Sequence, residues 1–254
     1  MKQILRPGTT GHRWFTAIGR SWTERIAILD LGLAALAMAS GVTDVTAFLS
    51  LGDVFTSAMT GNTALLGIAL SQGRLVSATH SVAALIGFSL GALLGAAMNI
   101  RRRQSNAAVL EVVRLLLLTE ICCLGVFAAI LTSTGPPPES AVLYALILLS
   151  AVGMGLQGVA ARQINSPGVN TIVFTSTLIN IVISLTGTFM RGSETRSVHP
   201  DTKRQIGMFL AYAFGAILAG VLAGPALSLL AWIPMVAVVL ALGCCMATVR
   251  SASP

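Results

Sequence analysis

The sequence contains few charged residues. Asp, Glu, Lys and Arg make up 10% of its 254 residues, hydrophobic residues make up 55%, and the mean hydropathy is +0.84. A soluble domain carries about 25% charged residues, so this chain has too few to cover a water-exposed surface. Apolar runs of about 20 residues recur, whereas the short alternating strands of a membrane barrel are missing. The composition therefore predicts an all-α, polytopic helical membrane protein whose first partner is the lipid bilayer.

Cysteine and histidine are also scarce. The four cysteines form two adjacent pairs, Cys122–Cys123 and Cys244–Cys245, inside apolar runs, and there are three histidines. Neither zinc-ligand nor redox-motif spacing occurs, so we expect no metal and no cofactor. The G-x-S-x-G pattern at Gly87–Gly91 lies in a continuous apolar run, whereas a nucleophile elbow needs a strand, a turn and a helix. We therefore expect that the chain is not an enzyme.

Basic residues outnumber acidic ones, giving a net charge of +7. No stripe of Lys and Arg alternates with aromatic residues, so a nucleic-acid partner is not expected; Lys and Arg instead mark the cytoplasmic loops of membrane proteins. Residues 1–25 are predicted to form a basic cytoplasmic segment, and residues 26–250 a single transmembrane domain. The apolar run after residue 25 continues into a polar element at Gly41–Asp44, which favours a retained first span over a cleaved signal peptide.

Eight segments are apolar enough to lie in the bilayer, and the basic residues choose between two topologies. If all eight cross, Arg101–Arg103 and Arg162 fall outside, against the positive-inside rule. If residues 54–70 and 169–189 do not cross, every basic residue except Arg74 falls inside. We therefore predict six full spans plus two re-entrant or broken segments, with both termini cytoplasmic. Eight full spans remain the alternative.

The two halves of the chain, about residues 26–132 and 140–250, match element by element. Each contains a VFTS sequence, at Val54–Ser57 and Val173–Ser176, and each ends in a span with a cysteine pair. With three crossings in each half, the halves have opposite orientations, which is the inverted-repeat plan of many secondary transporters. With eight crossings in total, the repeats would be parallel.

Several short motifs are spread along most of the chain. They are Gly41-Val-Thr-Asp44, Phe55, Met59-Thr60-Gly61-Asn62, Phe88-x-x-Gly91-Ala, Met154-Gly155-Leu156-Gln157, Ala161-Arg162 and Pro167-Gly168-Val169. With these motifs the chain resembles, from about Ile26 to Arg250, the YoaK family of bacterial multi-pass membrane proteins, a family of unknown function. Thr175-Ser176-Thr177 stands where members tend to have Thr-Gly-Thr. The resemblance implies a multi-pass protein of a bacterial inner membrane and supplies no substrate.

Polar residues interrupt the apolar sequence twice, at residues 41–62 and 155–177. Irregular polar backbone at membrane depth occurs only where it is buried in protein or lines a watery cavity. Asp44 could bind a cation or a proton, or could cap a following helix. Thr60, Gly61 and Asn62 could coordinate a solute, or could form hydrogen bonds between helices.

The second half would complete the site with Gln157, Asn170 and Thr175, and Gln157 would take the place of Asp44 in the repeat. Glu120, near the middle of an apolar span, is a candidate proton relay. The leading functional prediction is a small-solute permease or secondary transporter with a polar site at the bilayer midplane. The solute would be an unknown small polar molecule or a cation. The alternative is a non-transporting scaffold, sensor or partner subunit.

Overall fold

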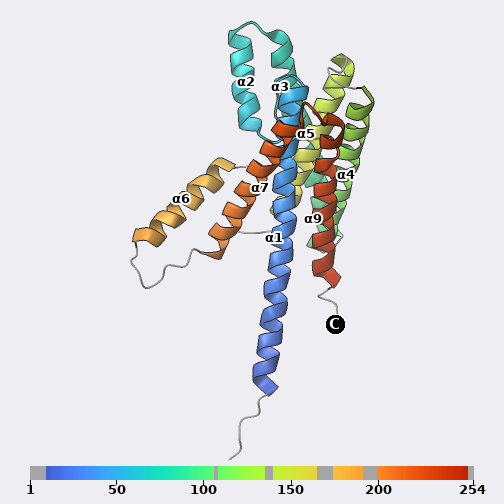
Figure 1. The fold of residues 1–254 in the computed structure, drawn as a ribbon. Helices are drawn as coiled ribbons and strands as arrows, with labels where there is room; N and C mark the ends of the chain where they lie inside the picture. The colour runs from blue at the N-terminus through green and yellow to red at the C-terminus, as the bar shows by residue number, and fades with distance from the viewer. Residues whose placement is uncertain (1–9, 106–107, 135–139, 165–173, 191–198, 251–254) are drawn as a thin grey trace, which may run out of the picture.

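The computed structural model describes residues 10–105, 108–134, 140–164, 174–190 and 199–250 (Figure 1). Within these ranges six helical segments are long and apolar enough to cross a membrane, and they coincide with the six predicted crossings. The prediction of a six-span, all-α membrane protein is therefore confirmed. The helices are α1 (Thr10–Ser50), α2 (Met59–Ser71), α3 (Leu75–Gln104), α4 (Val109–Thr134), α5 (Ser140–Gln163), α6 (Phe174–Met190), α7 (Pro200–Leu222), α8 (Leu227–Leu230) and α9 (Ile233–Arg250).

The described parts of the predicted non-crossing segments contain the two shorter apolar helices α2 and α6, and residues 169–173 of the second segment lie outside the described residues. At 1.5 Å per residue their 13 and 17 residues extend roughly 20 and 26 Å, less than the roughly 30 Å of a bilayer core. In Figure 1, α2 lies beside α3 at one end of the bundle, and α6 is tilted away from the bundle next to α7.

The segment between α1 and α2 turns back into the bundle. Positive φ angles at Gly52 (84°) and Asp53 (60°) reverse the chain, and the ring of Phe55 then stacks on that of Phe48, with centroids 5.1 Å apart. The next residues reach Asp44, which lies six positions before the end of α1 and so roughly 9 Å inside it. The helix α2 begins at this depth and runs out again beside α3.

Helix packing repeats with a two-fold relation between the halves. Helix α1 of the first half packs against α7 and α9 of the second half, and α5 of the second half packs against α3 and α4 of the first half. These contacts match when α1 is exchanged with α5, α3 with α7, and α4 with α9. In Figure 1, α1 and α5 run in opposite directions, and the start of α1 lies at the same end of the bundle as the end of α9. The arrangement agrees with the predicted inverted repeat.

Glycines allow the closest helix crossings between the two halves. A Cβ built on Gly41 would overlap backbone atoms of Tyr212 and Ala216 in α7, and a Cβ built on Gly155 would overlap backbone atoms of Phe88 and Ala92 in α3. Since only glycine lets two backbones approach so closely, these residues fix how α1 meets α7 and how α5 meets α3.

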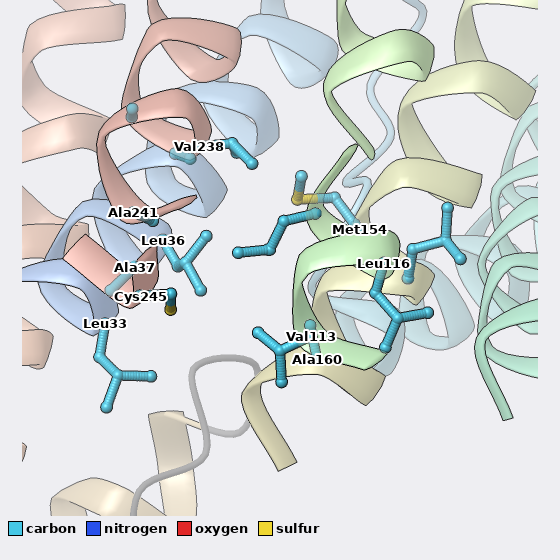
Figure 2. Close-up of a cluster of buried hydrophobic side chains, with 14 of the residues drawn as sticks. Leu33, Leu36, Ala37, Val113, Leu116, Met154, Ala160, Val238, Ala241 and Cys245 are labelled. Atoms are coloured by element: carbon cyan, nitrogen blue, oxygen red, sulfur yellow. The ribbon is translucent and has the colours of Figure 1, made fainter. Parts of the chain in front are cut away.

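The apolar core lies where α1, α4, α5 and α9 meet (Figure 2). Leu36 from α1 and Val238 from α9 lie on one side, and Leu116 from α4 and Met154 from α5 lie on the other. These four side chains are fully buried. The halves are thus joined through a core to which both contribute, which we call the central core.

Candidate functional site: a cavity between the repeats

A cavity of about 640 Å³ lies between the two halves of the chain. The segment before α2 and the first turn of α2 form one side, α3 and α7 contribute an aromatic residue each, and α5 and α6 complete the described wall. Its volume lies within the range of known ligand pockets. The described lining residues are Ser57, Ala58, Met59, Thr60, Gly61, Phe88, Ala92, Gly155, Gly158, Val159, Arg162, Thr175 and Tyr212.

The predicted residues Thr60 and Gly61 lie on the cavity wall. They belong to the first turn of α2, and Ala58, the residue before that helix, provides no side-chain cap. A Cβ on Gly61 would come within 2.9 Å of the ring of Phe55, so glycine lets this ring pack against the turn. The turn therefore presents a hydroxyl group and the positive end of a helix to the cavity.

Asn62 lies behind the wall and holds the turn in place. Its side-chain oxygen accepts a hydrogen bond from the backbone N–H of Phe55 (2.8 Å), and its amide nitrogen donates to the Phe55 carbonyl (2.6 Å). Asn62 is fully buried. The Asn62 side chain thus pairs with both backbone groups of Phe55, as a neighbouring peptide group would. This pairing favours hydrogen bonding within the protein over coordination of a solute as the role of Asn62.

Asp44 also lies behind the wall, and its carboxylate accepts five hydrogen bonds. Oδ1 accepts from the backbone N–H groups of Thr56 (2.8 Å) and Ser57 (2.6 Å) and from the Thr56 hydroxyl (3.2 Å). Oδ2 accepts from the hydroxyls of Ser57 (2.6 Å) and Tyr212 (2.9 Å). The carboxylate thus ties α1 to both the re-entrant segment and α7. Five donors favour an anchoring role for Asp44.

The position of Gln157 corrects one sequence-based pairing. Because Gly41 and Gly155 make equivalent crossings, the residue three positions after each is equivalent, which pairs Asp44 with Gly158. Gln157 is instead equivalent to Thr43. Its amide nitrogen donates to the Leu36 carbonyl (3.1 Å) and the Ser40 hydroxyl (2.7 Å), away from the cavity wall.

The remaining predicted residues fall in three different places. Thr175, in the first turn of α6, lines the cavity. Glu120 is fully buried in α4, and the cavity wall does not include it. Asn170 lies outside the described residues. Among the residues that the structure covers, no group of three His, Cys, Asp or Glu side chains could hold a metal ion.

Among the wall residues that were not predicted as site residues, Phe88, Arg162 and Tyr212 have the largest side chains with aromatic or charged groups. Arg162 served only as a marker of topology, and the two aromatic residues occupy equivalent positions in α3 and α7. A comparison of the repeats offered a signal, since the pair Asp44 and Tyr212 replaces the pair Gly158 and Phe88. The acid Asp44 and the phenol Tyr212 occur together, and the equivalent positions of the other half, Gly158 and Phe88, have neither an acid nor a phenol.

The fold and the cavity define a class: a helical membrane protein of six spans in two inverted repeats, with a ligand-sized cavity between them. Residues 32–245 match a family model described as a protein of unknown function (DUF1275), and the chain belongs to this family. It is 30% identical over 204 residues to the UPF0700 transmembrane protein YoaK of Bacillus subtilis (strain 168), covering 80% of this chain and 88% of the relative. The resemblance inferred from the motifs is confirmed. No solved structure matches the chain.

Proposed function

We propose that this protein transports a small solute through the cavity between its two repeats. The main support for this proposal is the position of the cavity, which lies where the re-entrant segment of one half meets helices of the other half. Inverted-repeat transporters bind their substrates at such a junction of broken helices. A scaffold or sensor does not need a cavity there, so the cavity favours transport.

The orientation follows from the basic residues. Arg101, Arg102 and Arg103 lie in the last turn of α3, and Arg162 lies in the last turn of α5. Arg103 donates a hydrogen bond to Gln163 (3.0 Å), so the two ends are adjacent. The start of α1 and the end of α9 lie at the same end of the bundle (Figure 1). By the positive-inside rule, we place this end in the cytoplasm of a bacterial cell.

A first prediction tests whether water reaches the cavity. In a variant whose four native cysteines are replaced by alanine, Thr60→Cys and Thr175→Cys are expected to react rapidly with a charged, water-soluble thiol reagent. Thr46→Cys is the matched control, because Thr46 is also a helical threonine but is 1% exposed. The rates would be measured by mass spectrometry of the protein in lipid vesicles. Equal, slow rates at positions 60 and 46 would rule out a hydrated pathway.

The wall also indicates the charge of the solute. Arg162 is the one ionised side chain among the described wall residues, and the first turn of α2 adds the positive end of a helix. Most of the other wall residues are apolar or small, including Phe88 and Val159. A guanidinium group and a helix N-terminus both favour an anion, so we propose an amphipathic solute with one negative group.

A second prediction tests this charge preference with phenylacetate, phenylacetamide and phenethylamine, which share one skeleton. We expect phenylacetate to raise the melting temperature of the wild-type protein most, because ligand binding stabilises the native state. Arg162→Gln should weaken phenylacetate binding about 10-fold or more, since hydrogen bonds to charged groups contribute about 1.5–3 kcal/mol. Arg101→Gln, outside the wall, makes the same charge change and should leave binding unchanged. An equal loss in both variants would assign the effect to overall charge.

A further inference from the structure

The central core contains polar atoms that no described residue satisfies. Both carboxyl oxygens of Glu120 and the side-chain oxygen of Gln157 are buried and have no hydrogen-bond partner among the described residues. Both side chains are 0% exposed. An unpaired buried carboxylate costs several kcal/mol even after the protein relaxes, and the cost persists within a bilayer. The Glu120 carboxyl group therefore needs a positive partner or a proton, and the Gln157 oxygen needs a hydrogen-bond donor.

The two side chains lie at the same level of the hairpin formed by α4 and α5. A Cβ on Gly153 would lie 3.7 Å from Leu124 and 3.8 Å from Cys123, so these residues are opposite each other. The two helices are antiparallel neighbours. Glu120 lies one helical turn from Leu124 on α4, and Gln157 lies one helical turn from Gly153 on α5, both in the direction away from the connection between the helices. Glu120 is thus level with Gln157.

Neighbouring residues show that Glu120 faces the core. It lies one turn from Leu116 and one turn from Leu124, which are both fully buried in the central core, and residues four apart share one face of a helix. Gln157 points toward α1, where its amide nitrogen is bound by Leu36 and Ser40. Its free oxygen therefore remains as an acceptor within the same core.

We propose that Glu120 and Gln157 form a proton-binding site in the central core, with the proton carried by the Glu120 carboxyl group. When water reaches Glu120, the O–H bond breaks, the proton passes to water and a carboxylate remains; rebinding restores the neutral acid. Each cycle moves one positive charge and changes no other bond. The α5 helix carries Gln157 on one side and the cavity residues Gly155 and Gly158 on another, so it joins the proton site to the cavity.

Other titratable groups near Glu120 do not supply a positive partner. The helices packed against α4 are α5, α9, α3 and α8. The described charged groups of α1 are already bound, Asp30 to Arg204 and Asp44 to its five donors. The described titratable side chains in or against the central core are the thiols Cys123 of α4 and Cys245 of α9 and the phenol Tyr212 of α7, which donates a hydrogen bond to Asp44. None of the three is a cation, and α3 and α8 contribute no titratable side chain to this core.

Infrared spectroscopy of the purified full chain in lipid tests the proposal. At neutral pH the wild type should show the carbonyl stretch of a protonated carboxylic acid, and deuterium oxide should shift it once the site exchanges. Glu120→Gln should abolish this band. Glu111→Gln, at an exposed site in the first turn of the same helix, should retain it. Gln157→Met should move the band toward the position of a carboxyl group without an acceptor.

Two further measurements complete the test without depending on any variant that fails to fold. Isotopic labelling of glutamate in the unaltered protein should shift the band, and labelling of aspartate should not. Absence of the band at neutral pH, its persistence in Glu120→Gln, or its loss on adding sodium at fixed pH would overturn the proposal; the last result would indicate a cation site. None of these measurements needs a transported solute, so the proton site and the proposed transport can fail separately.

Discussion

Replacement of Asp44 by alanine is expected to destabilise the folded protein by about 3–5 kcal/mol, the range for removing one partner of a buried charged network. Alanine would remove the acceptor of five hydrogen bonds, which are donated by Thr56, Ser57 and Tyr212. Because these donors belong to the re-entrant segment and to α7, the loss should loosen the start of α2 first. Unfolding in detergent, followed by tryptophan fluorescence or circular dichroism, would measure the effect.

Two milder variants separate an anchoring role from ion binding. Asp44→Asn keeps one oxygen for the backbone donors of Thr56 and Ser57, and Tyr212→Phe removes a single hydrogen bond. Each should cost about 1.5–3 kcal/mol, the value of a hydrogen bond to a charged group, which is less than the alanine variant. If Asp44 instead served to bind a cation, Asp44→Asn would keep full stability and lose cation dependence. Such a result would overturn the anchoring role.

The fold could be predicted from the sequence because two independent patterns agree. Apolar length located the spans, and the basic residues Arg101–Arg103 and Arg162 favoured six crossings over eight. The lengths of α2 and α6 confirm the outcome. These patterns work because the bilayer imposes both a minimum helix length and a rule for charge. The boundaries were less predictable: α7 begins at Pro200, five residues before the apolar segment expected from Gln205.

The site was only partly predictable, because polarity in a sequence does not show which way a side chain points. Thr60 and Thr175 line the cavity, whereas Asp44 and Asn62 use their polar atoms to hold the backbone behind the wall. All four have the polarity expected of a site. The close glycine crossings determine which residues face the cavity. Because these crossings are contacts between distant parts of the chain, local sequence does not reveal them.

The glycine crossings give the second large effect, and α7 contains a matched pair for testing it. A Cβ on Gly215 would overlap backbone atoms of Met38 in α1, whereas a Cβ on Gly220 meets nothing within 4 Å. Both glycines lie in the same helix. Gly220→Ala is expected to stabilise the protein slightly, by at most about 1 kcal/mol from helix propensity. Gly215→Ala should destabilise it by about 1–3 kcal/mol or more, the cost of forcing atoms into a packed contact.

The equivalent glycine in the other half makes the same argument testable twice. A Cβ on Gly91 would overlap the backbone of Val152 in α5, as one on Gly215 overlaps Met38 in α1. If the two repeats are held together alike, Gly91→Ala and Gly215→Ala should lower the melting temperature by similar amounts, and Gly91→Leu and Gly215→Leu should prevent folding. Both crossings border the cavity, through Phe88 and Ala92 on one side and Tyr212 on the other. Spreading either crossing should therefore also speed labelling at Thr60→Cys. A Gly215→Ala variant as stable as Gly220→Ala would show that α1 and α7 do not meet at this distance.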